Sequence, residues 1–280
     1  MTNHSPRLDH RGERQFIAAP PNISFCFYVL ALRTHGTKKT PKFMMNVDIN
    51  YMKAAVNYLV SQPDTTDICG VVGTSVSGHH SMILGSMEHR IKALIIINAT
   101  AMTNDLTTHL VDGKRYPYHT TNPEQLSRMR FVHGGFACGE ADNDYEFAEE
   151  TYAKVENIAN DAKIMIVAGD DDHSVGSIQH MQRIYHRMWR YGRREDATCL
   201  VAKGLGHDVD PAFMPIRPFA YSPGYGILMY TGGKFEEGGK EQRRVWPIMI
   251  DFLAKHIGRP TSVPLTEAEL TSLDAPASKI

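Results

Sequence analysis

The stretch CGVVGTSVSGHHSM, Cys69 to Met82, decides the fold. Its first half is apolar and β-branched, as in a buried strand, and its second half begins with small residues and continues in a helix-like pattern. The junction Gly73-Thr74-Ser75-Val76-Ser77 is close to the Gly-x-Ser-x-Gly pattern, in which a serine lies on a sharp strand-to-helix turn. The stretch therefore predicts an α/β fold with Ser75 at the carboxyl end of a strand.

Apolar runs and amphipathic runs alternate on both sides of this junction. We expect strands over 23–32, 68–73, 91–100, 162–169 and 197–204, and helices over 48–60, 77–87, 177–191 and 243–256. The run over 91–100 is continuously apolar, which is typical of a strand buried on both faces of a parallel sheet. Short links between strands and helices predict a mostly parallel sheet with helices on both faces.

The same patterns predict the domain organisation. Residues 1–22 are polar without periodicity, and we interpret them as an irregular N-terminal segment. Residues 23–258 form the α/β domain, in which 101–160 does not show clean strand–helix repeats and is predicted to be an insertion or a lid-like region. Residues 259–280 are rich in Pro, Ser and Thr and are expected to be a flexible tail.

Composition excludes several classes of protein. The chain of 280 residues has 30 basic and 31 acidic side chains, a balance that does not favour nucleic-acid binding. It has no apolar run of the roughly 20 residues that a membrane span needs, and its start lacks the apolar core of a secretory signal. Cys69 and Cys199 lie in apolar strand-like runs, and we interpret them as buried thiols of a reducing compartment.

Three loops that follow predicted strands carry three different reactive groups. They hold Ser75, the acidic run Asp170 to Asp172, and His207. A serine hydroxyl is a weak nucleophile that needs an imidazole to take its proton and a carboxylate to orient that imidazole. The order serine, acid, histidine is that of α/β-hydrolases, and the amide of Val76 would donate to the oxyanion.

Each of these residues has an ordinary alternative. Ser75 could cap a helix, the aspartates could be solvated loop charges, and His207 could be one of 14 unremarkable histidines. A helix would turn the adjacent histidines His79 and His80 away from the serine hydroxyl. Together with Asp170 and His173, these two histidines show no recognised metal-ligand spacing. We therefore expect neither a metal ion nor a cofactor.

Four motifs resemble one known family: NYMKAAVNYLVSQPDT, GVVGTSVSG, VAGDDDHS and GLGHDVDPAFMP. The chain is similar, from about Phe27 to Ile257, to the catalytic domain shared by type I acyl-CoA thioesterases and bile acid-CoA:amino acid N-acyltransferase. This resemblance implies an α/β-hydrolase fold with Ser75 as the nucleophile, Asp172 as the acid and His207 as the base, and Asp171 as the fallback acid. It also implies an N-terminal truncation, because the family's β-sandwich domain and early sheet strands have no counterpart here.

The resemblance implies an activity as well. Members with a cysteine nucleophile transfer the acyl group to an amino acid, and members with serine mostly hydrolyse it. Ser75 thus predicts hydrolysis of acyl-CoA to free fatty acid and CoA. The alternatives are a dienelactone-type or small-ester carboxylesterase, an N-acyltransferase, and a weakly active or inactive binding protein, because the second oxyanion donor of the family has no counterpart here.

The end of the chain bears on localisation. Ser278-Lys279-Ile280 differs by one aliphatic exchange from the peroxisomal address Ser-Lys-Leu. A peroxisomal or cytoplasmic enzyme is therefore expected. The expected partner is a small acyl ester or acyl-CoA, with neither nucleic acid nor membrane span, and nothing in the sequence specifies an oligomeric state.

Overall fold

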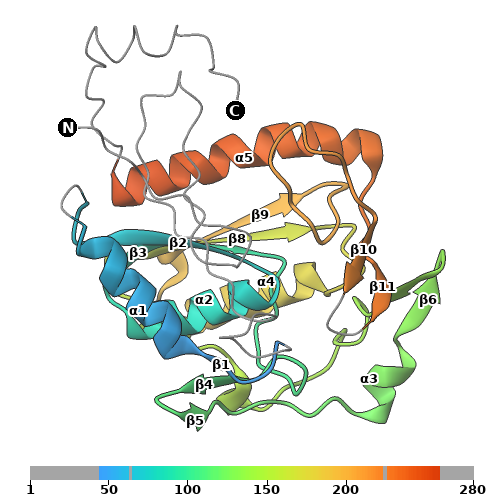
Figure 1. Cartoon of the computed structure of the whole chain (residues 1–280), viewed down its shortest axis with the longest axis horizontal. Helices are drawn as coiled ribbons and strands as arrows, with labels where there is room; N and C mark the ends of the chain where they lie inside the picture. The colour runs from blue at the N-terminus through green and yellow to red at the C-terminus, as the bar shows by residue number, and fades with distance from the viewer. Residues whose placement is uncertain (1–43, 63–64, 223–225, 259–280) are drawn as a thin grey trace, which may run out of the picture. The chain divides into compact units, whose positions relative to one another are not determined.

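A computed structural model describes residues 44–62, 65–222 and 226–258 of the chain (Figure 1). Its centre is a four-stranded parallel sheet in the order β2 (Cys69–Thr74), β3 (Ile91–Ile97), β8 (Lys163–Gly169) and β9 (Ala197–Ala202). All three strand pairs are parallel. The predicted α/β class with a mostly parallel sheet is therefore confirmed, whereas the strand expected over 23–32 lies outside the described residues.

Helices cover both faces of this sheet. α2 (Val76–Met87) packs against β2 and β3, and α4 (Ser177–Arg190) packs against β8 and β9, while α5 (Phe235–Ile257) crosses the sheet on the opposite face (Figure 1). α1 (Ile49–Val60) lies beside α2 and is capped by Asp48, whose carboxylate accepts a hydrogen bond from Asn50 N at 2.9 Å. This cap satisfies one of the free amides at the start of the helix.

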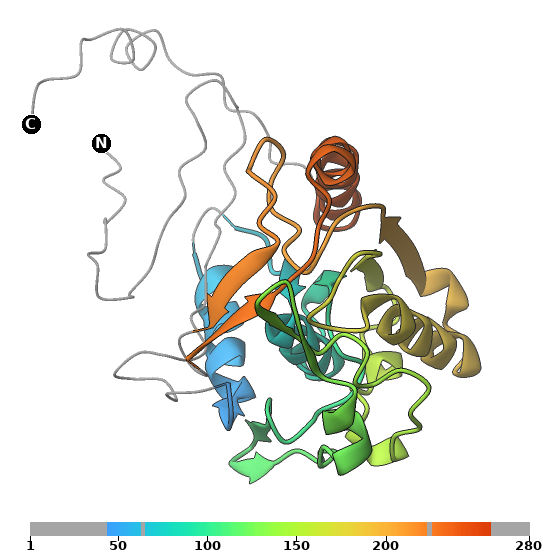
Figure 2. The same cartoon turned by 90° about the vertical axis from the view of Figure 1, so that its right-hand side faces the viewer.

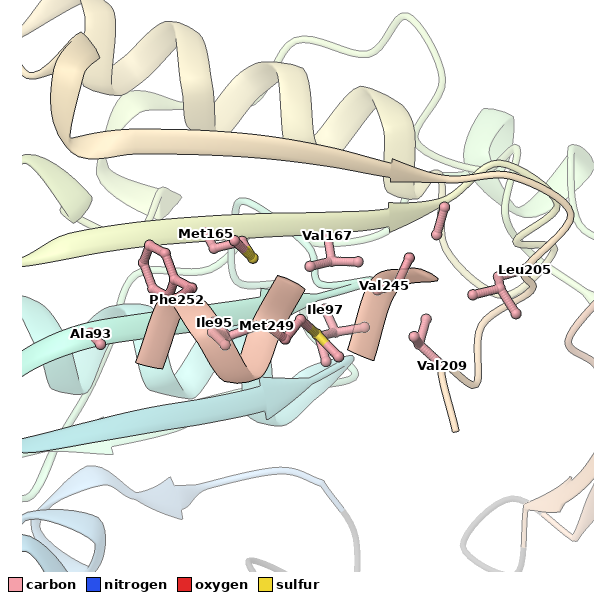
Figure 3. Close-up of a cluster of buried hydrophobic side chains, with 11 residues drawn as sticks. Ala93, Ile95, Ile97, Met165, Val167, Leu205, Val209, Val245, Met249 and Phe252 are labelled. Atoms are coloured by element: carbon pink, nitrogen blue, oxygen red, sulfur yellow. The ribbon is translucent and has the colours of Figure 1, made fainter. Parts of the chain in front are cut away.

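A cluster of buried apolar side chains lies between the sheet and α5. β3 contributes alanine and isoleucine side chains, β8 contributes Met165 and Val167, and α5 contributes Val245, Met249 and Phe252 (Figure 3). Five of the seven residues of β3 are completely buried, which fits the continuous apolar run expected of a central strand. Removing this surface from water is the main stabilising contribution to the sheet.

Two smaller sheets are built by the remaining strands. β1 (Val47–Asp48), β4 (His109–Val111) and β5 (Lys114–Arg115) form one, and the other has the order β10 (Phe219–Ser222), β11 (Ile227–Tyr230), β7 (Gly135–Ala137) and β6 (Arg130–Val132). Figure 2 shows the orange strands β10 and β11 beside the green segment that carries β6 and β7. The region 101–160 thus contributes to both of these sheets. It also contains α3 (Pro123–Ser127) and short 3₁₀ turns at Glu149–Thr151 and Val155–Asn157. A third 3₁₀ turn, Arg194–Asp196, precedes β9.

Two expectations are wrong. α5 begins at Phe235, not near Arg243, because its first turns pack through Gly238, where a Cβ would come within 2.8 Å of Gly204 O. Because glycine has no side chain, a contact made through it adds nothing to the apolar periodicity from which the start of the helix was predicted. The two thiols expected to be buried are not: Cys69 is half-buried, and Cys199 is exposed because β9 is an edge strand of the described sheet.

Candidate active site

The carboxyl ends of the four parallel strands meet along one edge of the sheet. Thr74 of β2 pairs with Ile97 of β3, Ile97 pairs with Val167 of β8, and Gly169 pairs with Ala202 of β9. The loops that follow these strands carry the serine, aspartates and histidine singled out in the sequence. In open α/β sheets this edge is where ligands bind.

Ser75 lies on a strained turn between β2 and α2. Its φ of 57° and ψ of −128° belong to a region that L-residues rarely adopt. The turn is held by the Ser75 amide, which donates to Ile97 O at 2.8 Å. A Cβ on Gly73 would come within 2.4 Å of Ser81 Oγ, so the turn leaves no room for a side chain two residues before the serine.

Ser77 stands two residues after Ser75, where the Gly-x-Ser-x-Gly pattern has a glycine. It is exposed, and its hydroxyl donates to Thr74 O at 2.6 Å and accepts from Thr74 N at 3.1 Å. The tight contact falls one residue later, where a Cβ on Gly78 would lie 2.7 Å from Ala99 Cβ. Gly78, one residue later than the second glycine of the pattern, is therefore the position at which the packing of α2 requires a glycine.

His207 joins the serine to an aspartate. His207 Nε2 lies 2.8 Å from Ser75 Oγ, and its Nδ1 lies 2.9 Å from Asp172 Oδ2. The Asp172 carboxylate is 1% exposed, and the His207 ring is 13% exposed. Three residues that are far apart in the sequence thus form one hydrogen-bonded chain, and their assignment as nucleophile, base and acid remains a prediction.

The three consecutive aspartates have three different partners. Asp170 accepts from Gly204 N at 2.6 Å, and Asp171 accepts from Gly233 N at 2.8 Å. Asp172 accepts from the amides of Ser174 and Val175 and from the Ser177 hydroxyl, in addition to its contact with His207. The structure therefore places Asp172, and not the fallback Asp171, beside the imidazole.

The environment of His207 changes its proton affinity. Burial disfavours the charged ring and lowers its pKa, but the carboxylates of Asp172 and Asp208 outweigh burial, so the pKa is raised above its usual value. The Asp172 contact also fixes the tautomer: Nδ1 carries the hydrogen that it donates, which leaves Nε2 as an acceptor for the Ser75 hydroxyl. This is the arrangement that a general base needs.

The oxyanion donor stays a prediction. Val76 is the first residue of α2, and the amides in the first turn of a helix have no intrahelical acceptor. Its N–H is therefore suited to an oxyanion beside Ser75.

The other histidines that the sequence singled out have surroundings of their own. His79 contacts Thr100 O at 3.0 Å and Thr103 Oγ1 at 2.8 Å, and both His79 and His80 are buried. His173 packs against Tyr230 with ring centroids 4.7 Å apart. No group of three or more His, Cys, Asp or Glu side chains that could hold a metal ion lies within residues 44–62, 65–222 and 226–258.

One contributor to the site has no signal of its own in the sequence. Ser177, the first residue of α4, donates its hydroxyl to Asp172 Oδ2 and is buried. A serine at the start of a helix normally indicates a cap, and only the fold of the Asp172 loop turns it toward the carboxylate.

The sequence profile described as "BAAT / Acyl-CoA thioester hydrolase C terminal" matches residues 47–259. Acyl-coenzyme A amino acid N-acyltransferase 1 of Mus musculus is 27% identical over 232 residues, which are 82% of this chain and 54% of the relative. Peroxisomal succinyl-coenzyme A thioesterase of Mus musculus is 25% identical over 237 residues, with 83% and 54% covered. The chain spans about half the length of the curated relatives that it matches.

Two solved structures that are similar to the chain match at low sequence identity. A puromycin-hydrolysing peptidase of Mycobacterium tuberculosis matches with a TM-score of 0.41 and 14% identity, over 76% of this chain and 25% of that one. The acylaminoacyl peptidase of Pyrococcus horikoshii matches with a TM-score of 0.39 and 11% identity, over 79% and 29%.

Two further expectations bear on location in the cell. Among the residues that the structure describes, no helix has the length and apolar character to cross a membrane. The terminal tripeptide Ser278-Lys279-Ile280 lies outside the described residues.

Proposed function

The chain belongs to the BAAT / acyl-CoA thioester hydrolase C-terminal family, and from that premise we propose that it is a serine hydrolase that cleaves acyl-CoA thioesters to free fatty acid and CoA. The observation that carries the proposal is the hydrogen-bonded chain Asp172–His207–Ser75 on a strained strand-to-helix turn. Two of the relatives named above carry acyltransferase or thioesterase names, which fits a thioester substrate.

The proposed reaction has two half-reactions. In the first, His207 Nε2 takes the Ser75 proton while Oγ attacks the thioester carbonyl carbon; the carbon–sulfur bond then breaks, and CoA leaves with the proton from His207. In the second, His207 takes a proton from water, the hydroxide attacks the acyl-serine, and the acid leaves as Ser75 regains its proton. The N–H of Val76 would stabilise the oxyanion in both steps.

The nature of the nucleophile favours hydrolysis over transfer. The resemblance associates serine with hydrolysis and cysteine with acyl transfer, and position 75 is serine. Acyl transfer to an amino acid is the second candidate, because the relative that is 27% identical is named an amino acid N-acyltransferase.

The experiment measures CoA release from palmitoyl-CoA, p-nitrophenyl acetate cleavage, and product identity with glycine or taurine present. We expect CoA release with free palmitate as the product whether or not the amino acid is added. Formation of N-acyl amino acid would favour the transferase, and turnover of the small ester alone would favour a carboxylesterase. No adduct on Ser75 after fluorophosphonate treatment of the folded protein would contradict all three.

A further inference from the structure

Asn98 follows directly after β3 and adopts an unusual backbone conformation. Its φ is 48°, a left-handed value that L-residues other than asparagine and aspartate seldom take. The side chain is 1% exposed and lies among the loops that carry the site residues. A buried amide in this conformation needs partners for each of its polar atoms.

Both polar atoms of the Asn98 carboxamide have hydrogen-bond partners. Nδ2 donates to Gly206 O at 2.9 Å and to His207 O at 2.8 Å, and Oδ1 accepts from Gly169 N at 2.8 Å. One partner is thus the backbone of the histidine that contacts Ser75. Another is the last residue of β8, directly before the three aspartates.

The backbones that Asn98 contacts lie close to each other. A Cβ on Gly169 would come within 2.4 Å of Leu205 O and within 2.6 Å of Gly206 O. The two strand-end loops are therefore in direct backbone contact, and Asn98 reaches them from the neighbouring strand. The carbonyl oxygen of the preceding residue, Ile97, accepts a hydrogen bond from the amide N–H of Ser75.

We propose that Asn98 is a positioning residue, which fixes the His207 loop against the Asp172 loop and so sets the distance from the imidazole to the Ser75 hydroxyl. This inference rests on the proposed serine-hydrolase function. The β3 end holds Ser75 through Ile97 O and holds His207 through the Asn98 carboxamide, so a single strand end determines the separation of the two groups.

An amide is required at this position by the chemistry of its partners. Two of them are carbonyl oxygens that need donors, and the third is an N–H that needs an acceptor. Asp has the same shape but would direct a carboxylate oxygen at two carbonyl oxygens. Gly accepts the positive φ without strain and removes all three hydrogen bonds.

The test uses Asn98→Asp and Asn98→Gly, with Gln125→Glu as the control. Gln125 is also a buried amide: its Nε2 donates to Asp142 Oδ1, and its Oε1 accepts from Asn122 N and contacts His119 Nε2. None of these partners is a site residue. Thermal melting establishes that each variant folds, and Asn98→Gly decides the question if Asn98→Asp does not fold. The measured quantities are the rate of Ser75 modification by a fluorophosphonate, and kcat and KM for palmitoyl-CoA.

We expect both Asn98 variants to be modified about 10²-fold more slowly than the wild type, the scale expected for a small misplacement of a reacting group. kcat should fall with little change in KM, because the loss concerns the reacting geometry and not substrate binding. Gln125→Glu should be modified at the wild-type rate.

The inference would be overturned if Asn98→Gly folds and its Ser75 is modified at the wild-type rate. It would also be overturned if Gln125→Glu slows the modification of Ser75 as much as the Asn98 variants do. The labelling rate does not depend on which acyl ester is the natural substrate. A wild type that is labelled but inactive on palmitoyl-CoA would therefore contradict the proposed substrate and leave the role of Asn98 to be decided by the variants. A wild type that is not labelled would overturn both proposals.

Discussion

At the scale of single residues, the protonation of His207 controls the proposed reaction. Only the neutral ring can take the proton of Ser75, and the nearby carboxylates of Asp172 and Asp208 raise the pKa of the ring despite its burial. kcat/KM should therefore fall as the pH decreases through this raised pKa, which lies above 6.5.

Asp172→Asn should change this profile in two ways. Removing the carboxylate lowers the pKa of His207, so the acidic limb of kcat/KM should move to lower pH. The plateau should fall by about 10³–10⁴-fold, because an amide favours the wrong tautomer. Asp171→Asn is the matched exchange and should leave the limb in place, since Asp171 contacts Gly233 N instead. A shifted limb in Asp171→Asn alone would show that the acid has been misassigned.

At the same scale, the sequence predicts some residues of the site and not others. Ser75, Asp172 and His207 each follow a recognisable apolar run, so their position at one sheet edge can be inferred. Asn98 and Ser177 cannot be found this way. Asn98 at a strand end indicates only a turn, and its contacts with Gly206 and His207 depend on segments more than 100 residues away.

At the scale of elements, the turn between β2 and α2 requires a glycine at position 73. A Cβ on Gly73 would meet Ser77 O at 2.5 Å as well as the Ser81 hydroxyl. Backbone atoms cannot yield as a flexible side chain end can, so the helix would have to move away from the strand.

Gly73→Ala should therefore lower the free energy of unfolding by about 1–3 kcal/mol, as overpacking does in closely packed sites. It should also slow Ser75 labelling, since the turn carries the nucleophile. Ser77→Gly restores the expected pattern at an exposed position and should keep the turn intact. Urea denaturation and labelling measure both effects. Equal stability of Gly73→Ala and the wild type would refute the tight turn.

The elements also differ in how well the sequence predicts them. β2, β3, β8 and β9 can be predicted because each appears in the sequence as a run of mostly apolar or β-branched residues, and β3 and β8 are buried along most of their length. β6, β7, β10 and β11 have three or four residues each and few buried side chains, so they lack a readable period. Their pairing joins region 130–137 to region 219–230, which is a contact that only the tertiary structure determines.

For the whole molecule, buried histidines make stability depend on pH. Burial lowers the pKa of His79 to about 4 and that of His109 to about 2, and it also lowers the pKa of His180. His109 packs between His79 and Tyr116, with ring centroids at 5.4 and 4.8 Å. Because these folded-state pKa values lie below the usual 6.5, the unfolded chain binds more protons in acid, and stability is lost as the pH falls below 6.5.

His109→Leu should reduce this loss. The variant removes one buried group that must become charged on acidification, so its free energy of unfolding should fall less steeply between pH 6.5 and pH 5 than that of the wild type. His186→Leu is the control, because His186 is exposed on α4. Urea titrations at several pH values measure the slope. The same slope in wild type and His109→Leu would contradict the assignment of this histidine.

The central claim is that Ser75 forms the acyl-enzyme, and CoA release from palmitoyl-CoA by Ser75→Ala tests it most directly. Ser86→Ala serves as the control, because the Ser86 hydroxyl donates to Ile83 O within α2, away from His207. We predict that Ser75→Ala keeps the wild-type melting behaviour and loses turnover by about 10³-fold or more, while Ser86→Ala retains it. Thioester cleavage by folded Ser75→Ala at the wild-type rate would contradict the account.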